Sequence, residues 1–297
     1  MRLDDYRTSD NVGDQRGQSF GGGGGGFGGG GLGLILGLVG SRFGIIGIIV
    51  VVGGAMLLGI NPFGGGGSGV VGPAPHTATG GGTAQQACSV DAASRFSCQV
   101  LASTEDTWGT IFAEQGQRYT PAKFIFYGGR GQSGCGAAQS AMGPFYCPTD
   151  NSIYLDTSFY GELQNRFGAA GDFAQAYVIA HEVGHHIQFL TGALNSANAQ
   201  QQRVSAREGN AIQVRVELQA DCYAGVWAAR NRNRLEPGDV EEGLRAASAI
   251  GDDTLQKAAQ GRVVPESFTH GTSAQRMEWL RRGLESGNPA ACDTSAV

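Results

Sequence analysis

The chain has 297 residues, of which 41% are hydrophobic and 16% are charged, and its formal net charge at pH 7 is −5. This apolar fraction is enough to build a hydrophobic core, and an acidic balance without a basic cluster gives no support for nucleic-acid binding. Of the 51 glycines, 29 lie before residue 83, so the N-terminal quarter differs in composition from the rest of the chain.

The first segments of the chain are recognised by their amino-acid composition. Residues 1–31 end in an almost pure glycine tract that starts at residue 21, and they are predicted to form a disordered, Gly-rich cytoplasmic tail. Residues 32–60 are apolar, and within them residues 43–60 contain no charged side chain, which is just long enough for one transmembrane helix. Residues 61–84, rich in Gly and Pro, read as a flexible linker. The remaining residues, 85–297, have the size of one domain.

The charges around the apolar segment predict its orientation. Four arginines precede residue 43, and no Lys or Arg follows the segment until Arg95. The positive-inside rule therefore predicts a single-pass protein of the cytoplasmic membrane, with a cytoplasmic N-terminus and a periplasmic or extracellular domain. A cleaved signal peptide is the alternative, but the apolar run starts more than forty residues in and no clear small-x-small site follows it.

Cysteine usage agrees with an oxidising compartment. All six cysteines lie after the apolar segment, and an even number in an extracytoplasmic domain indicates disulfides. Six cysteines allow fifteen pairings, and the sequence alone does not choose among them. We favour Cys135 with Cys147, which flank a predicted hairpin, and Cys222 with Cys292, which leaves Cys88 with Cys98. Reduced thiols in a cytosolic protein are the alternative.

Hydrophobic patterns divide the domain into strands followed by helices. A helix is expected from Ala92 to Trp108 and beyond, and short strands over 123–127, 145–147 and 152–156. Four helices follow, starting near Asp172, Ser205, Asp239 and Ser273, and the first two of these starts carry capping-box patterns. Strands first and helices afterwards predict an α+β domain with a small sheet.

The most informative motif is His181-Glu182-Val183-Gly184-His185. Two imidazoles four residues apart lie on one face of a helix, so both can bind one Zn²⁺. Glu182, beside the first of them, is predicted to accept a proton from the attacking water and to deliver it to the leaving amine. A structural helix with exposed histidines is the alternative.

A catalytic zinc needs a third protein ligand and an open fourth position. Glu217 and Asp221 are four residues apart on the helix that starts at Ser205 and share one face. We expect Glu217 to be the third ligand, and Asp221 to accept a hydrogen bond from the far nitrogen of a ligand histidine. The alternative is a solvated acidic pair on an amphipathic helix.

Several short sequence motifs resemble those of one known family and occur in the same order along the chain. They are Thr104-Glu105-Asp106-Thr107-Trp108, Cys135-Gly136-Ala137, Gly143 to Pro148, Gly171 to Gln175, His181 to His186, Glu217 to Asp221 and Phe268 to Thr272. From about Thr104 to Cys292 the chain resembles the bacterial neutral zinc metallopeptidase family of membrane-anchored proteins. The resemblance implies a zincin-like domain and a gluzincin-type peptidase, with two His and one Glu as ligands of one Zn²⁺ per chain.

The resemblance also suggests roles outside the motif. Related gluzincin families place a His and an Arg near the metal after the Glu-x-x-x-Asp helix, which implies that His270 donates a hydrogen bond to the oxyanion, with Arg276 close by. A surface loop histidine is the alternative for His270. His186 lies one residue off the ligand face and reads as a packing residue. In a zincin-like arrangement one strand runs beside the cleft, and residues 151–156 are the candidate for pairing with an extended peptide.

Two functions follow from these observations. The first is a membrane-anchored zinc endopeptidase that hydrolyses peptide bonds of extracytoplasmic proteins. The second is a non-catalytic, zinc-stabilised binding module of the cell envelope. A structural zinc usually has four protein ligands, commonly including Cys, whereas the sequence offers three ligands and a Glu that a structural site does not need. The pattern therefore favours the enzyme.

Overall fold

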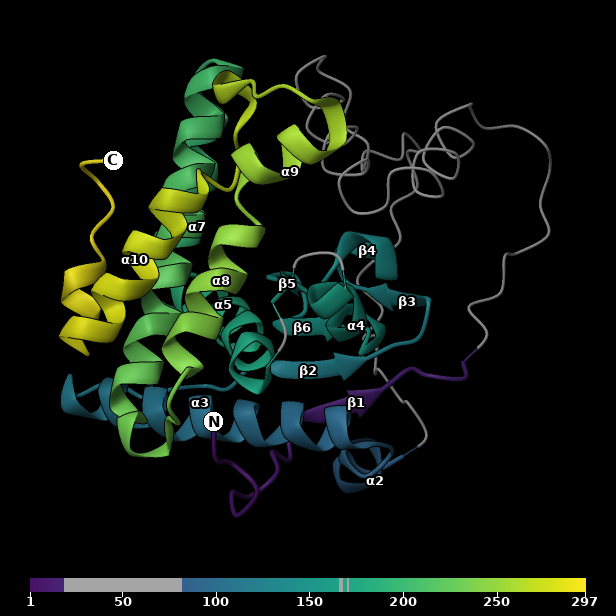
Figure 1. Cartoon of the computed structure of the whole chain (residues 1–297). Coiled ribbons are helices and arrows are strands. Elements are labelled where there is room, and N and C mark those ends of the chain that lie inside the picture. The colour runs from purple at the N-terminus through teal and green to yellow at the C-terminus, as the bar shows by residue number, and fades with distance from the viewer. Residues whose placement is uncertain (19–81, 166–167, 170) are drawn as a thin grey trace, which may run out of the picture.

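The computed structural model describes residues 1–18, 82–165, 168–169 and 171–297. Within these residues a small β-sheet lies beside a group of packed helices, and the long helix α3 (Ala92–Glu114) runs along one side of both (Figure 1). The fold is therefore mixed α+β with small sheets, as the sequence predicts.

The main sheet has four strands in the order β1-β2-β6-β5. Three strands are parallel, namely β1 (Val12–Asp14), β2 (Lys123–Phe126) and β6 (Ser152–Leu155), while β5 (Phe145–Cys147) is antiparallel to β6. Consecutive side chains of β2 enter different parts of the core: Phe124 belongs to the main cluster and Ile125 to a second one. The two edges of the sheet are therefore β1, which lies beside α2, and β5, which lies beside α5.

The second sheet and the helices complete the domain. A two-stranded hairpin, β3 (Arg130–Ser133) and β4 (Gly136–Gln139), precedes β5. The other helices are α2 (Ala84–Cys88), α4 (Ser158–Asn165), α5 (Asp172–Leu190), α6 (Ala193–Gln201), α7 (Ala206–Arg230), α8 (Asp239–Ala249), α9 (Asp252–Gln260) and α10 (Ser273–Ser286). The capping box of Ser205 and Glu208 starts α7 as predicted, whereas α5 is capped by Gly171 and Asp172 lies in its first turn.

Helix α7 packs closely against α5 and α10, and glycines permit this approach. A Cβ atom placed on Gly184 of α5 would lie 2.9 Å from the carbonyl oxygen of Ala220 in α7. A Cβ on Gly283 of α10 would overlap the backbone of α7 at Cys222. Ordinary Cβ contacts begin near 3.4 Å, so neither helix could lie so close to α7 with a larger residue at these positions.

The first eighteen residues are part of the domain. Strand β1 pairs with β2, with Val12 opposite Phe124, and Leu3 is buried in the main core. Ser9 Oγ donates a hydrogen bond of 2.6 Å to Glu105 of α3, and Arg16 donates one of 2.9 Å to the carbonyl oxygen of Ala87. The predicted disordered tail over residues 1–31 is therefore wrong for residues 1–18. A three-residue strand is too short for its periodicity to be detected, and its partner is more than a hundred residues away.

This pairing bears on the predicted membrane topology. Strands β1 and β2 share backbone hydrogen bonds, so residues 1–18 and the domain lie on the same side of any membrane. The predicted topology, a cytoplasmic N-terminus joined by one span to an outer domain, would place β1 and β2 on opposite sides of a membrane. The predicted span at 43–60 lies outside the described residues, as does almost all of the predicted linker at 61–84. Among the helices of the described ranges, none is long and apolar enough to cross a bilayer.

The six cysteines form the three pairs favoured from the sequence. These disulfides are Cys88–Cys98, Cys135–Cys147 and Cys222–Cys292. The first joins α2 to α3, the second joins the turn between β3 and β4 to the edge strand β5, and the third joins α7 to the C-terminal segment. Each disulfide therefore links two separate segments of the domain.

Candidate metal centre and active site

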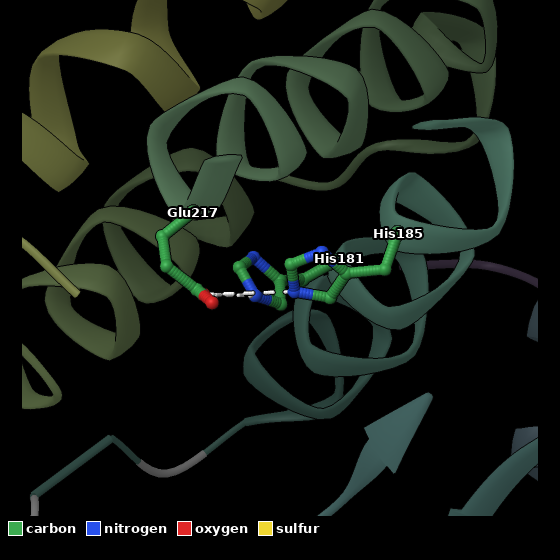
Figure 2. Close-up of side chains that lie close together, drawn as sticks. All are labelled: His181, His185 and Glu217. Carbon is green, nitrogen blue, oxygen red and sulfur yellow. Dashed lines mark ion pairs between the residues drawn. The ribbon is translucent and has the colours of Figure 1, made fainter. Parts of the chain in front are cut away.

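Three side chains from two helices converge on one point. His181 and His185 extend from α5, and Glu217 faces them from α7 (Figure 2). Oε2 of Glu217 lies 3.2 Å from Nε2 of His181 and 3.6 Å from Nε2 of His185, and the three ligand atoms are all within 4.8 Å of one another. Atoms bound to one tetrahedral Zn²⁺ at ordinary distances are roughly 3.4 Å apart. The arrangement therefore fits one zinc ion.

The hydrogen bonds of the two histidines leave the correct nitrogens free for a metal. Nδ1 of His181 donates to Asp221 at 2.8 Å, and Nδ1 of His185 donates to the amide oxygen of Gln188 at 2.9 Å. Each ring therefore directs its Nε2 toward Glu217, where loss of the Nε2 proton would expose the lone pair that a metal ion binds. This is the protonation pattern that a zinc ligand needs, and it is fixed by residues outside the ligand set.

Asp221 is itself held in a buried network. Its side chain is fully buried, Arg276 donates to both of its oxygens at 2.8 and 2.9 Å, and Tyr177 Oη donates at 2.6 Å. Burial alone would raise the pKa of Asp221, but the charges of Arg276 and His181 and their hydrogen bonds lower this pKa to about 2. Asp221 thus stays ionised and aligned toward His181. Arg276, which the resemblance placed near the metal, reaches the site through this carboxylate.

Gln188 was not identified from the sequence. Its side chain is fully buried, and Nε2 donates to the carbonyl oxygen of Val216 at 2.7 Å and to Gln219 at 3.0 Å. These two bonds fix the amide orientation, so Oε1 faces His185. The only available signal was its position three residues after His185, on the same face of the helix.

Protons compete with a metal for this site. Burial lowers the pKa of His185, but the Glu217 carboxylate raises it to about 9 when no metal is bound. Burial raises the pKa of Glu217, but the charge of His185 and hydrogen bonds from both histidines bring it well below its usual value. Metal binding must therefore displace a proton from the histidines, which makes affinity fall at acidic pH.

Glu182 lies beside this centre without joining the ligand group. It lines the same pocket, its exposed fraction is 7%, and it is outside the set of ligand atoms that converge. Burial raises the pKa of Glu182, while the charges of His181 and His185 lower it, and the net result is a raised value. A carboxyl group whose pKa lies above the ordinary range is suited to exchanging protons near neutral pH.

His270 reaches the pocket from the loop between α9 and α10. Its Nδ1 lies 3.3 Å from an oxygen of Asp252, whose other oxygen accepts backbone N–H bonds from Thr269 and His270 at 2.7 and 2.6 Å. Nε2 is then the nitrogen left to face the pocket. Burial alone would lower the pKa of His270, but the hydrogen bond to Asp252 and the charge of Glu217 raise it. The sequence did not single out Asp252.

His186 is buried as a packing residue, with an exposed fraction of 1%, and burial lowers its pKa. Both ring nitrogens have partners: Nε2 lies 2.7 Å from the carbonyl oxygen of Thr120, and Nδ1 lies 3.0 Å from Tyr146 Oη. It therefore points away from the metal ligands, toward strand β5.

The ligands open into a cavity of about 450 Å³. Its polar residues are grouped around the metal centre, and its other walls are largely apolar. One wall comes from the segment that contains β5, and the rest from helices: Met142, Pro144, Phe145, Tyr146, Phe159, Val178, Leu194, Val216, Ile250 and Leu255. The predicted substrate strand at 151–156 is not at this wall, because β6 lies inside the sheet between β2 and β5. β5 holds the edge position instead.

A second acidic group, formed by Asp172, Asp239 and Glu242, lies elsewhere on the domain. The amine of Met1 lies 2.7 Å from Asp172 and 3.1 Å from Asp239. The ammonium group of Met1 already pairs with two of these three carboxylates, so this group has no comparable claim to a metal ion.

Comparison with known proteins shows the family to which the chain is similar. Residues 1–295 match the family described as "Putative neutral zinc metallopeptidase". The chain is 54% identical over 206 residues to the uncharacterized protein YpfJ of Escherichia coli K12, covering 69% of this chain and 72% of that protein. It is 40% identical over 261 residues to the uncharacterized protein Rv2575 of Mycobacterium tuberculosis H37Rv, covering 81% of this chain and 84% of that protein. No solved structure matches this chain.

Proposed function

This chain belongs to the neutral zinc metallopeptidase family, and we propose that it is a zinc-dependent endopeptidase of the gluzincin type. The observation that carries the proposal is the convergence of His181, His185 and Glu217 beside the buried carboxyl group of Glu182. Three protein ligands leave one position open, as in catalytic zinc sites. A site that served only to join two helices would need neither the open position nor Glu182.

The residues around the centre divide the chemistry among them. When bound, Zn²⁺ polarises the scissile carbonyl group and lowers the pKa of water. Glu182 accepts a proton from the attacking water and delivers it to the leaving amine, for which its raised pKa is suited. His270, held by Asp252, directs Nε2 into the pocket and donates to the oxygen that becomes negative.

The cavity suggests how a peptide binds. Strand β5 is the edge of the sheet beside the metal centre, and an extended peptide can add to it as a further strand. The apolar walls of the cavity then favour a bulky apolar side chain next to the scissile bond.

The compartment is also a proposal. Three disulfides favour an oxidising, extracytoplasmic environment, and the pairing of β1 with β2 supports placing residues 1–18 there as well. We propose that the apolar residues 43–60 attach the protein to the cytoplasmic membrane, and that residues 1–18 and the domain remain on its outer side.

A comparison of wild type with Glu182→Gln tests the function. Both proteins should bind one zinc ion per chain, and only the wild type should cleave a library of extended peptides. We expect the substitution to reduce kcat by about 10²–10⁴-fold, the usual contribution of a general base. A Glu182→Gln protein that retains zinc and full activity would disprove the mechanism. A wild type that binds zinc and cleaves no peptide would favour the non-catalytic binding module.

A further inference from the structure

His186 follows the metal ligand His185 directly, yet it is buried on another face of α5, between that helix and the sheet. A carbonyl oxygen can only accept, so the 2.7 Å contact with Thr120 means that Nε2 of His186 carries a hydrogen. In the neutral ring Nδ1 is then an acceptor, and the Tyr146 hydroxyl, which also lies 3.3 Å from Oδ1 of Asn151, donates to it at 3.0 Å. The two bonds fix both the tautomer and the direction of the ring.

Tyr146 is the middle residue of the edge strand β5 and lines the cavity. Its ring packs against His186, with centroids 5.4 Å apart, and against Phe189 of the same helix, with centroids 6.3 Å apart. Within the sheet, β5 pairs with β6 on one side only. Its position relative to the metal centre therefore depends on what joins it to α5.

We propose that His186 is a positioning residue, which sets the distance and register of the substrate-binding strand β5 relative to the metal ligands on α5. This inference rests on the proposed peptidase function. Strand β5 determines where a paired peptide lies, whereas α5 determines where His181 and His185 lie. The hydrogen bond from Tyr146 to His186 is a direct polar link between the two elements. A misplacement of about 1 Å between reacting groups can lower a rate by about 10²-fold.

Two variants remove opposite ends of this link. His186→Gln keeps an N–H group near the position of Nε2, for Thr120, and lacks the acceptor that Tyr146 uses. Tyr146→Phe keeps the ring and its packing but lacks the hydroxyl. We expect each variant to lower kcat/KM for an extended peptide by about 10–100-fold, with unchanged zinc content. The double variant should be no worse than Tyr146→Phe alone, because the hydroxyl whose acceptor His186→Gln removes is already absent there.

A conservative variant and a second readout separate positioning from structural damage. His186→Asn places an amide oxygen near Nδ1, so it should recover part of the activity that His186→Gln loses. Hydrogen exchange of the backbone amides of residues 145–147 should be faster in His186→Gln and Tyr146→Phe, while exchange in α5 stays unchanged. This second readout requires no substrate.

The outcomes distinguish the two levels of the argument. A wild type without peptidase activity would overturn the proposed function, and exchange in β5 would still test the link. An active wild type whose kcat/KM and β5 exchange are unaffected by His186→Gln would overturn the positioning role. Loss of zinc in His186→Gln, or additive effects in the double variant, would also overturn it, because His186 would then act on the metal or through separate contacts.

Discussion

Replacing Gly184 by Ala tests whether the close contact between α5 and α7 sets the geometry of the metal centre. Gly184 lies between the two metal-binding histidines in sequence and faces α7. An added Cβ would meet the carbonyl oxygen of Ala220 at 2.9 Å, about half an ångström short of ordinary contact. The two helices would have to separate by a similar amount. Since Glu217 is on α7 and both histidines are on α5, the separation would be transmitted directly to the ligand set.

The expected magnitudes follow from this displacement. Zinc sites tolerate about 0.2 Å in their ligand distances, so a shift of about 0.5 Å should weaken zinc binding by tenfold or more. Overpacking costs about 1–3 kcal/mol of unfolding free energy, while the higher helix propensity of Ala returns about 1 kcal/mol. Gly209 on α7 is the matched control, because a Cβ there meets nothing within 4 Å. Gly209→Ala should therefore be neutral or stabilise the protein by up to about 1 kcal/mol.

Two measurements on both variants decide the matter. Urea unfolding of the metal-free proteins gives the difference in stability, and competition with a coloured chelator gives the zinc affinity. Gly184→Ala should be less stable than Gly209→Ala by about 1–3 kcal/mol and should bind zinc more weakly. Equal stability and equal affinity of the two variants would refute the role that we assign to this helix contact.

Four further predictions follow from the described residues. Asp221→Asn should weaken zinc binding about 10–100-fold in chelator competition, and unchanged affinity would contradict its role. Asp252→Asn should move the alkaline limb of the kcat/KM profile to lower pH, because the raised pKa of His270 depends on that carboxylate; an unmoved limb would count against His270 as the donor. The raised pKa of His270 also makes the stability of the folded protein depend on pH. This contribution is fully present below pH 6.5, the ordinary pKa of an unfolded histidine, and it is lost as the pH rises through the raised pKa of His270 in the folded protein. Cys292→Ser, which breaks the Cys222–Cys292 disulfide, should lower the unfolding free energy by about 2–5 kcal/mol, and an unchanged urea midpoint would exclude this. An N-terminal tag and the domain should both be reached by a membrane-impermeant reagent in intact cells, whereas labelling of only one of them would contradict the pairing of β1 with β2.

The convergence of the three candidate metal ligands could be predicted because the spacing within each helix is local. His181 and His185 are one helical turn apart, and Glu217 and Asp221 repeat the same spacing, so each pair shares a face wherever its helix packs. Gln188 could not be recognised with them. A glutamine three residues after a histidine is unremarkable on a helix surface, and only the packing of α5 on α7 makes it buried.

The errors concern the order of strands, which a single sequence does not encode locally. Strand β1 has three residues, and it is stabilised by a partner beyond the Gly-rich segment. The strand at 151–156 was expected beside the cleft from the resemblance to a zincin-like arrangement, yet the continuous burial of residues 152–155 is typical of a strand inside a sheet. The less regular strand at 145–147 holds the edge. The prediction of disorder was based on the glycine tract at residues 21–31 and was wrongly applied to residues 1–18 as well. Residues 1–18 have the charged side chains and the buried apolar side chains of a folded segment.

Helix α7 connects the metal centre to the rest of the domain. It carries Glu217 and Asp221, it faces Gly184 through Ala220, and it is joined to the C-terminal segment by the disulfide of Cys222. A zinc ion bound between α5 and α7 links the same two helices, and at a thousandfold excess over Kd it stabilises the folded state by about 4 kcal/mol. This is comparable with the contribution of one disulfide. The disulfide and the zinc ion both act on α7, so loss of either one should destabilise α7 and weaken its packing against α5.

Strand β5 is held through other contacts, because it pairs with β6 in the sheet. The candidate metal ligands and the proposed substrate strand therefore depend on different parts of the structure, which meet at α5.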